Sequence, residues 1–184
     1  MRSCSVIGLC IVIMAVAPLS GYAERMQLVP FPVSEAPTVD GDLSEPCWRD
    51  AQSLSLLPMR TEDNGIPPTV VQVAYTEKIV VFAFTCFEPE IDELVTAPPG
   101  QGKAFQLDAV ELFLDTNSDM SSYFQLAASA SDTWASLYHS KPHNGVPFAG
   151  KFSAKAGILN DRYIIEIGIP FDQFPSSRQP LSVT

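Results

Sequence analysis

The chain has 184 residues, of which 46% are hydrophobic, and 21 acidic against 11 basic side chains give a formal net charge of −10. A chain of this length and hydrophobic content can bury the core of one domain. The negative charge argues against electrostatic binding to nucleic acid or anionic lipid, because both present negative phosphates.

The first 23 residues have the pattern of a secretory signal peptide. Arg2 supplies a positive charge, and the apolar run 5–17 is short for a membrane span. Small residues then precede an expected cleavage after Ala23. We expect residues 1–23 to be removed, 24–37 to form an N-terminal lead and 38–184 to form the domain. The protein would be exported to a periplasm, cell surface or medium, without a membrane span in its mature form; an uncleaved anchor is the alternative.

Cys47 and Cys86 are the two cysteines outside the signal-peptide segment. In an exported protein such a pair favours a disulfide. The bond would close a loop of about 40 residues and contribute roughly 4 kcal/mol in the chain-entropy model. Two buried free thiols are the alternative.

Beyond the proline-bearing segment 28–37, hydrophobic residues recur with a period of two, which is typical of strands. Segments 69–75 and 79–87 are rich in β-branched and aromatic residues and flank the polar residues 76–78, which predicts a hairpin. Further strands are predicted at 110–114, 123–130, 133–139, 150–159 and 163–169. Helical turns are expected only at 43–52, with Pro46 near its start, and at 171–174. The pattern predicts an all-β fold, an antiparallel β-sandwich of jelly-roll or immunoglobulin-like shape.

Two segments, 88–106 and 141–150, are long and rich in proline and glycine. Loops of that length in a compact domain are usually functional or lack a fixed structure. The chain stops at Thr184 without a turn signal, soon after the last predicted strand. We therefore expect a truncated C-terminal end, with further strands or domains downstream.

Three motifs resemble the family 9 carbohydrate-binding modules, which are secreted β-sandwiches related in shape to the DOMON domains. Asp40-Gly41 followed by Trp48 is similar to the family's entry turn and buried tryptophan. The segment 108–115, DAVELFLD, is similar to its V-E-x-F-x-D core, and Glu166 with 169–171 is similar to its E-x-x-I-P-F close. The resemblance covers about 38–174 and implies a non-catalytic domain that holds a polysaccharide or oligosaccharide.

The resemblance also implies site residues. Phe105 stands six residues before Glu111, where sugar-binding members carry a tryptophan, and its ring could stack on a pyranose. Glu111 matches the carboxylate that binds sugar hydroxyls, and Gln125 stands where members often carry an arginine. The family's second tryptophan falls beyond Thr184. Trp134 and Tyr138 lie four apart in one predicted strand, hence on one face, and are candidates either to replace it or to fill the core.

Acidic and amide side chains surround the strand 110–114, namely Asp108, Asp115, Asn117 and Asp119. An EF-hand is excluded, because Met120 and Leu126 occupy the places of its glycine and glutamate. Since family 9 modules commonly carry calcium, the resemblance implies another oxygen-ligand calcium site as an alternative to a simple polar turn.

No nucleophile elbow, HExxH motif or ordered Cys/His pair is present, so we expect no enzyme activity, although the domain could be accessory to a carbohydrate-active enzyme. A zinc site at His139 and His143 is disfavoured because the pair falls in a loop. Two alternatives to sugar binding remain. One is a structural or docking sandwich whose sugar site has degenerated. The other is a haem-binding DOMON-type domain that uses Met59 or Met120 with a histidine.

Overall fold

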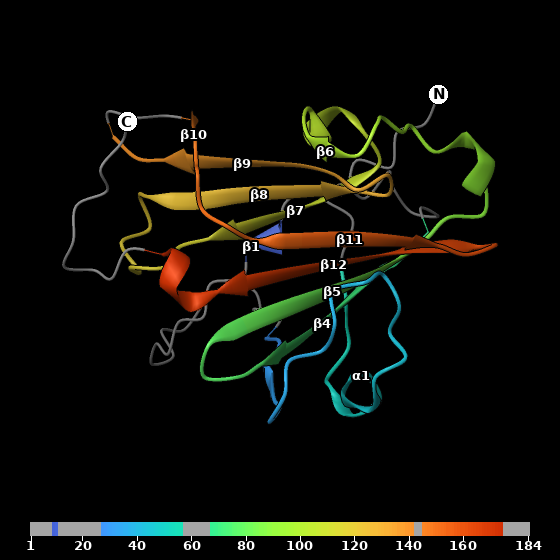
Figure 1. Ribbon diagram of the computed structural model, residues 1–184, viewed down its shortest axis with the longest axis horizontal. Coiled ribbons are helices and arrows are strands. Elements are labelled where there is room, and N and C mark those ends of the chain that lie inside the picture. Colours follow the sequence, from blue (N-terminus) through green and yellow to red (C-terminus); the bar gives the residue numbers. More distant parts are fainter. Residues whose placement is uncertain (1–8, 11–26, 57–66, 142–144, 175–184) are drawn as a thin grey trace, which may run out of the picture.

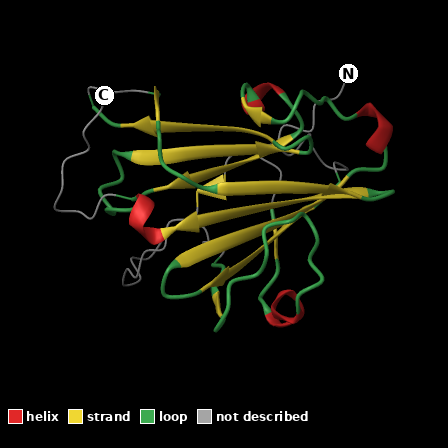
Figure 2. Cartoon of the chain, in the orientation of Figure 1, coloured by secondary structure: helices red, strands yellow, loops and turns green. Residues whose placement is uncertain are grey.

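The structure is a computed structural model of the chain, and it describes residues 9–10, 27–56, 67–141 and 145–174. Two packed β-sheets make up almost all of it (Figures 1 and 2). Sheet A has the order β1 (Leu9–Cys10), β7 (Ala109–Leu114), β8 (Tyr123–Ser129), β9 (Thr133–His139) and β10 (Val146–Pro147), with β6 (Gly100–Gln101) also paired to β9. Sheet B has the order β11 (Ser153–Ile158), β12 (Arg162–Pro170), β5 (Ile79–Phe87), β4 (Thr69–Tyr75) and β2 (Phe31–Pro32), with β3 (Leu54–Ser55) also paired to β4. The helical elements are α1 (Pro46–Asp50) and the 3₁₀ turns η2 (Ile91–Glu93), η3 (Ala104–Gln106) and η4 (Phe171–Gln173).

The predicted all-β class is confirmed, but the sheets are mixed rather than purely antiparallel. The longer strands pair antiparallel throughout, whereas β1 with β7, β2 with β4 and β6 with β9 pair parallel. Each parallel pair includes a strand of only two residues. Such a strand shows no hydrophobic alternation of its own, because tertiary position alone brings it beside a sheet.

The longer elements follow the predicted pattern closely. The predicted hairpin 69–75 and 79–87 is the pair β4–β5, and in its turn the Thr76 N–H donates to the Ile79 carbonyl at 2.9 Å. Both predicted helical turns form, as α1 and η4, and α1 carries proline in its first turn. The turns η2 and η3 lie in the 88–106 segment, where we predicted no regular structure.

The main core lies between the sheets. Alternate residues of each long strand face inward, and those of β5 and β12 meet those of β7 and β8 there; the largest fully buried side chains include Phe84, Phe124, Leu112, Leu126, Tyr163, Ile165 and Ile167. The residues of sheet B that alternate with these inward-facing ones form a second cluster on its outer face. There Trp48 and Ala51 pack against Ala74, Val81 and Ala83. Trp48 is 4% exposed, so its predicted place in the core is confirmed.

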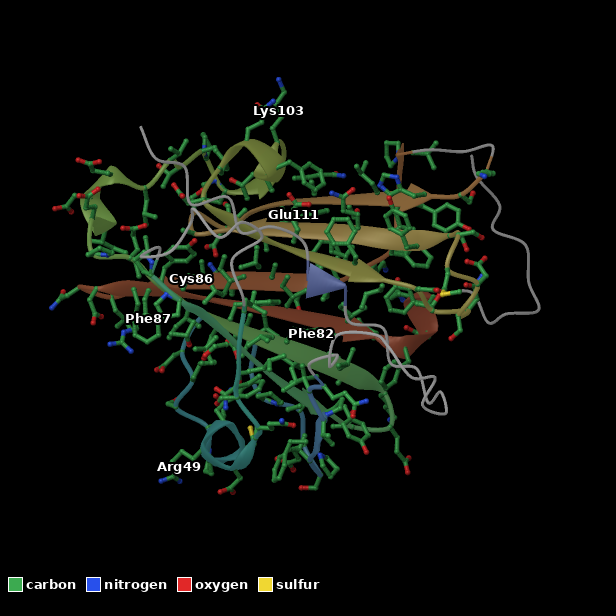
Figure 3. All side chains as sticks on the ribbon, turned by 180° about the vertical axis from the view of Figure 1, so that it is seen from behind. Arg49, Phe82, Cys86, Phe87, Lys103 and Glu111 are labelled. Atoms are coloured by element: carbon green, nitrogen blue, oxygen red, sulfur yellow. The ribbon has the colours of Figure 1, made fainter. Side chains whose placement is uncertain are left out.

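The predicted disulfide between Cys47 and Cys86 is wrong. Cys86 is buried in the core between the sheets, whereas Cys47 on α1 packs against the cluster on the outer face of sheet B. In Figure 3, α1, marked by Arg49, lies below sheet B, and Cys86 lies on β5 above it. The two thiols are on opposite faces of one sheet, so no rotamer can join them.

Of the expected signal peptide, residues 1–8 and 11–23 lie outside the described residues, and cleavage is not tested. Leu9–Cys10 runs as β1 beside β7, so cleavage after Ala23 would remove this strand from sheet A. In the part of the chain that the structure describes, no helix has both the length and the hydropathy to cross a membrane.

Candidate functional site

The outer face of sheet A brings polar and aromatic side chains together. Neighbours across strands share a face, and the register pairs Glu111 with Ala127, Gln125 with both Phe113 and Leu137, and Tyr123 with His139. The residues that alternate with them along the strands point to the other face. They include Leu112, Leu126 and Phe124, which fill the core between the sheets. The alternation therefore leaves the first group on the outer face, where most of its members are half-buried.

A chain of hydrogen bonds crosses this face from β7 to β9. The Gln125 Nε2 donates to Glu111 Oε2 at 2.7 Å, and Gln125 Oε1 lies 2.8 Å from His139 Nε2. Because an amide oxygen only accepts, His139 must carry its proton on Nε2 and donate it to Gln125. Glu111 thus orients the amide, and the amide selects the form of the imidazole.

Three aromatic rings lie beside these hydrogen bonds on the outer face of sheet A, one each from β7, β8 and β9. Tyr123 stacks on His139 with ring centroids 4.5 Å apart and an interplanar angle of 12°. Phe113 lies 5.8 Å from Tyr123 in a tilted arrangement. We call Phe113, Tyr123 and His139 the ring cluster. No motif in the sequence marks the ring cluster as a site; the one signal for it is that Tyr123 and Gln125 lie two apart in a predicted strand and so share a face.

The other end of the face is covered by η3, which carries Phe105. Ala104 of η3 is fully buried against Ala127 and Ala135, while Phe105 beside it is 37% exposed. Figure 3 shows Lys103 at the start of this turn, above the strand that bears Glu111. Small side chains beneath η3 let its backbone approach the sheet, so the turn that carries Phe105 lies over Ala127, the register partner of Glu111.

The long segment that leads to η3 is fastened to sheet A rather than loose. The Gly102 N–H donates to the Trp134 carbonyl at 2.9 Å, and Gly100 N–H to the Asp132 carbonyl at 3.0 Å. The Thr133 hydroxyl donates to the Pro98 carbonyl at 2.9 Å. These bonds give the segment that leads to η3 a fixed place on sheet A, so of the two expectations for 88–106 a lack of fixed structure is wrong for this part, whereas a function stays a prediction.

The four residues predicted to share calcium do not come together. Asp108 precedes β7 and Asp115 follows it, so the length of the strand separates them. Asp108 is buried and accepts a hydrogen bond from the Val95 N–H at 2.5 Å, which fastens the long segment to β7. Among the described residues, no three acidic, histidine or cysteine side chains gather closely enough to hold a metal ion.

Asp115, Asn117 and Asp119 instead build the turn between β7 and β8. Asp115 Oδ2 accepts from the Met120 N–H at 2.8 Å, and Asp119 Oδ1 accepts from the Ser122 N–H at 2.7 Å. Hydrogen bonds from the Ser122 hydroxyl and N–H hold the pKa of Asp119 well below its usual range. The turn geometry therefore accounts for these carboxylates, and calcium binding here stays a prediction.

Trp134 and Tyr138 are not brought together with Glu111 and Gln125. They face the space between the sheets, where Trp134 makes an edge contact with Phe152 at 5.0 Å and Tyr138 lies 5.0 Å from Phe124. Their register partners, Ala128 and Phe124, belong to the interior. Of the two interpretations that the sequence left open, core packing accounts for these contacts.

Of the residues considered for haem or zinc, Met59 and His143 lie outside the described residues. Met120 is 75% exposed in the β7–β8 turn, whereas His139 is bound to Gln125 on the sheet.

An open hollow of about 520 Å³ lies elsewhere, on the outer face of sheet B beside the β11–β12 turn. Its one arginine, Arg162, donates to both carboxylate oxygens of Asp161 at 2.7 and 2.8 Å and lies 4.4 Å from the centre of the Phe87 ring. This bonding lowers the pKa of Asp161. The charges of the hollow are thus already paired with each other.

No protein-family model and no curated protein sequence matches the chain. Solved structures do match it. A family 9 carbohydrate-binding module from Caldicellulosiruptor kristjanssonii, in complex with cellotriose, aligns with a TM-score of 0.55 and 16% identity over 85% of this chain and 72% of that chain. The module from that organism in complex with glucose aligns at 0.52 and 17% identity over 85% and 73%.

A "putative carbohydrate-binding protein" from Bacteroides uniformis aligns with a TM-score of 0.63 and 12% identity over 79% of this chain and 72% of that chain. At these identities the likeness concerns the fold. It agrees with the motifs at 40–48, 108–115 and 166–171, which predict the same architecture. The chain therefore has a fold like that of the family 9 carbohydrate-binding modules.

Proposed function

We propose that the protein is an exported, non-catalytic domain that binds carbohydrate on the outer face of sheet A. Phe105 would stack on a sugar ring, and Glu111 and Gln125 would bind its hydroxyl groups. The solved structures with the same fold support a carbohydrate-binding role, since two of them are complexes with glucose and cellotriose.

The observation that carries the proposal is the Glu111–Gln125 pair on the outer face of sheet A, over one end of which η3 carries the partly exposed Phe105. Sugar hydroxyls both donate and accept, so they are matched by a carboxylate that accepts and an amide that does both. The apolar face of a pyranose suits an aromatic ring. A site with one such ring and few polar groups should bind in the micromolar to millimolar range, about −4 to −8 kcal/mol.

The test is binding to a panel of polysaccharides and oligosaccharides, compared between the unchanged chain and Phe105→Ala. We expect binding to be lost or reduced at least about tenfold, which corresponds to about 1.4 kcal/mol. Phe171→Ala is the matched control, because Phe171 is 45% exposed on η4, which follows β12 of sheet B, and this variant should bind as the unchanged chain does. If the folded protein binds no glycan of the panel, sugar binding is contradicted and the structural or docking role is favoured.

Export is the second part of the proposal and rests on Arg2, the apolar run 5–17 and the small residues before Ala23. Expression of the full chain in a secreting host, followed by N-terminal sequencing, tests it. We expect Glu24 at the N-terminus of the exported protein. An intact N-terminus on a membrane-bound product would contradict cleavage.

A further inference from the structure

The surface that carries Glu111 and Gln125 continues beyond them along the strands. Past Gln125 the same face of β8 presents Tyr123, which stacks on His139 of β9 and contacts Phe113 of β7. The proposed function uses only the end near η3. We propose that the ring cluster is the far half of one elongated binding surface, which takes an uncharged oligosaccharide lying along the strands rather than a single sugar. This inference rests on the proposed function.

The surface is longer than a single sugar. Ala127 lies beneath η3, and Tyr123 lies four residues away on β8 with its side chain on the same face. At the rise of an antiparallel strand this separation is roughly 13 Å. A single pyranose ring is shorter, so a ligand that contacts both Phe105 and Tyr123 must contain more than one sugar.

The order of chemical groups along the surface also suits an oligosaccharide. One aromatic ring lies at the η3 end, hydrogen-bonding groups lie in the middle, and the ring cluster lies at the other end. Tyr123 and His139 are near-parallel at 4.5 Å, close to the spacing of adjacent strands, so their rings stand side by side on the sheet. Such rings offer an apolar body with a polar edge, which matches a sugar with its apolar faces and peripheral hydroxyls.

Charge indicates the class of sugar. On the three central strands, the residues of this face are Ala109, Glu111, Phe113, Tyr123, Gln125, Ala127, Ser129, Thr133, Ala135, Leu137 and His139. They contain one carboxylate and no lysine or arginine, so a uronic acid placed over Glu111 would meet a like charge that no lysine or arginine of these strands offsets. An uncharged oligosaccharide avoids this cost.

His139 has a distinct part in this arrangement, as a positioning residue. Its Nε2–H holds the Gln125 oxygen while Glu111 holds the Gln125 nitrogen, so the amide is restrained from both sides. The stack on Tyr123 in turn restrains the imidazole. Loss of His139 should therefore weaken short and long ligands by a similar factor, because both use Gln125. Loss of Tyr123 should weaken long ligands by the larger factor, because they lose a direct contact as well as the restraint on His139.

The experiment is calorimetric titration of the full chain with two pairs of probes, glucose with cellotriose and mannose with mannotriose. In at least one pair we expect the trimer to bind about tenfold tighter or more. Tyr123→Ala should remove that advantage, because it lowers the trimer affinity by a much larger factor than the monosaccharide affinity. His139→Ala should lower both affinities by a similar factor. Tyr123→Leu keeps the apolar volume and serves where the alanine variant is unstable, and Tyr75→Ala, at a 38% exposed tyrosine of sheet B, is the control.

The outcomes separate the two proposals. Equal affinities for monomer and trimer, both lost in Phe105→Ala, would overturn the elongated surface and leave the proposed function intact. A trimer advantage that survives in both Tyr123 variants would also overturn it. Tighter binding of trigalacturonic acid than of the neutral trimers would overturn the sugar class. No binding of any probe or panel glycan would overturn the proposed function, and this inference with it.

Discussion

The outer faces of the two sheets are built differently. Sheet B is covered by α1 and the chain before it, and Trp48 packs there on Ala74, Val81 and Ala83. Among the described residues, sheet A is covered over one end, where Ala104 of η3 packs on Ala127 and Ala135. Figure 1 shows α1 below β4 and β5, on the opposite side of the molecule from β8 and β9. Within the described part of the chain, sheet B is thus covered on both faces over β4 and β5, whereas sheet A beyond η3 is covered on one.

The difference explains the sequences of the strands and where function is placed. β5 reads IVVFAFTCF, nearly continuous in apolar residues, as expected for a strand with two covered faces. β8 reads YFQLAAS and alternates, with Tyr123 and Gln125 on the open face. Polar groups on an open face can exchange water for ligand at little cost, whereas a polar group under a covered face must be satisfied by the protein. The covered face therefore serves stability, and the open face is the one on which we propose that sugar binds.

The largest expected effect is a loss of unfolding free energy when a side chain of the covered face is removed. Trp48→Ala removes a side chain that is 4% exposed and should lower the free energy of unfolding by about 4 kcal/mol. Phe105→Ala on the open face should change it by less than about 1 kcal/mol. Urea unfolding of both variants measures this. Equal losses in the two would contradict the division between the faces.

The next effect concerns Glu166, which among the residues that the structure describes is the fully buried carboxyl on the covered face. Glu166 is fully buried, and its Oε2 accepts hydrogen bonds from the N–H groups of Asp40 and Gly41 at 3.0 and 2.9 Å. Burial raises the pKa of Glu166 from 4.5 to about 7, although these two hydrogen bonds act to lower it. The folded protein then keeps a proton that the unfolded chain releases, so this contribution is complete below about pH 4.5. It is lost as the pH rises towards 7, by up to about 3 kcal/mol.

Glu166→Gln should abolish that loss of stability, because an amide does not titrate. Urea unfolding at pH 5 and pH 7.5 measures the difference for each variant. Glu111→Gln is the matched control, since it removes a carboxyl from the open face and should keep the pH dependence of the unchanged chain. The same slope in Glu166→Gln as in the unchanged chain would show that Glu166 ionises normally.

A smaller effect, on sugar affinity, tests the role of Glu111 on the open face. Glu111→Gln keeps the shape of the side chain but replaces charge-assisted hydrogen bonds with neutral ones, a loss of about 1 kcal/mol. We therefore expect sugar affinity to fall about fivefold with no change in the free energy of unfolding. Calorimetric titration and urea unfolding measure the two. A loss of stability with unchanged affinity would make Glu111 a structural residue.

The smallest effect concerns the turn between β7 and β8. Since Asp115 and Asp119 already accept several hydrogen bonds from within the turn, we expect removal of calcium by EDTA to shift the melting temperature by less than about 1 °C. Thermal unfolding with calcium and with EDTA measures it. A larger shift that disappears in Asp119→Asn would establish a calcium site in the turn.

Much of the architecture could be predicted because the long strands carry their own pattern. The hairpin β4–β5 and the strand β9 begin and end where alternation predicts, and Pro46 marks the start of α1. The two-residue strands and η3 could not be predicted, since their conformation depends on the sheet beside them. The disulfide prediction failed for a related reason: cysteine count and export say nothing about which face of a sheet each thiol occupies.

For the site, the sequence by itself determined which residues can serve: the motif around Glu111, the aromatic ring of Phe105, and the shared parity of Tyr123 and Gln125 along one strand. Only the tertiary structure decided which of them meet. The pairing of β8 with β7 and β9 joined Gln125 to Glu111 and His139 and turned Trp134 and Tyr138 inward. The physical reason is that alternation assigns residues to two faces, whereas strand register and the packing of distant segments decide which face is buried and which side chains touch.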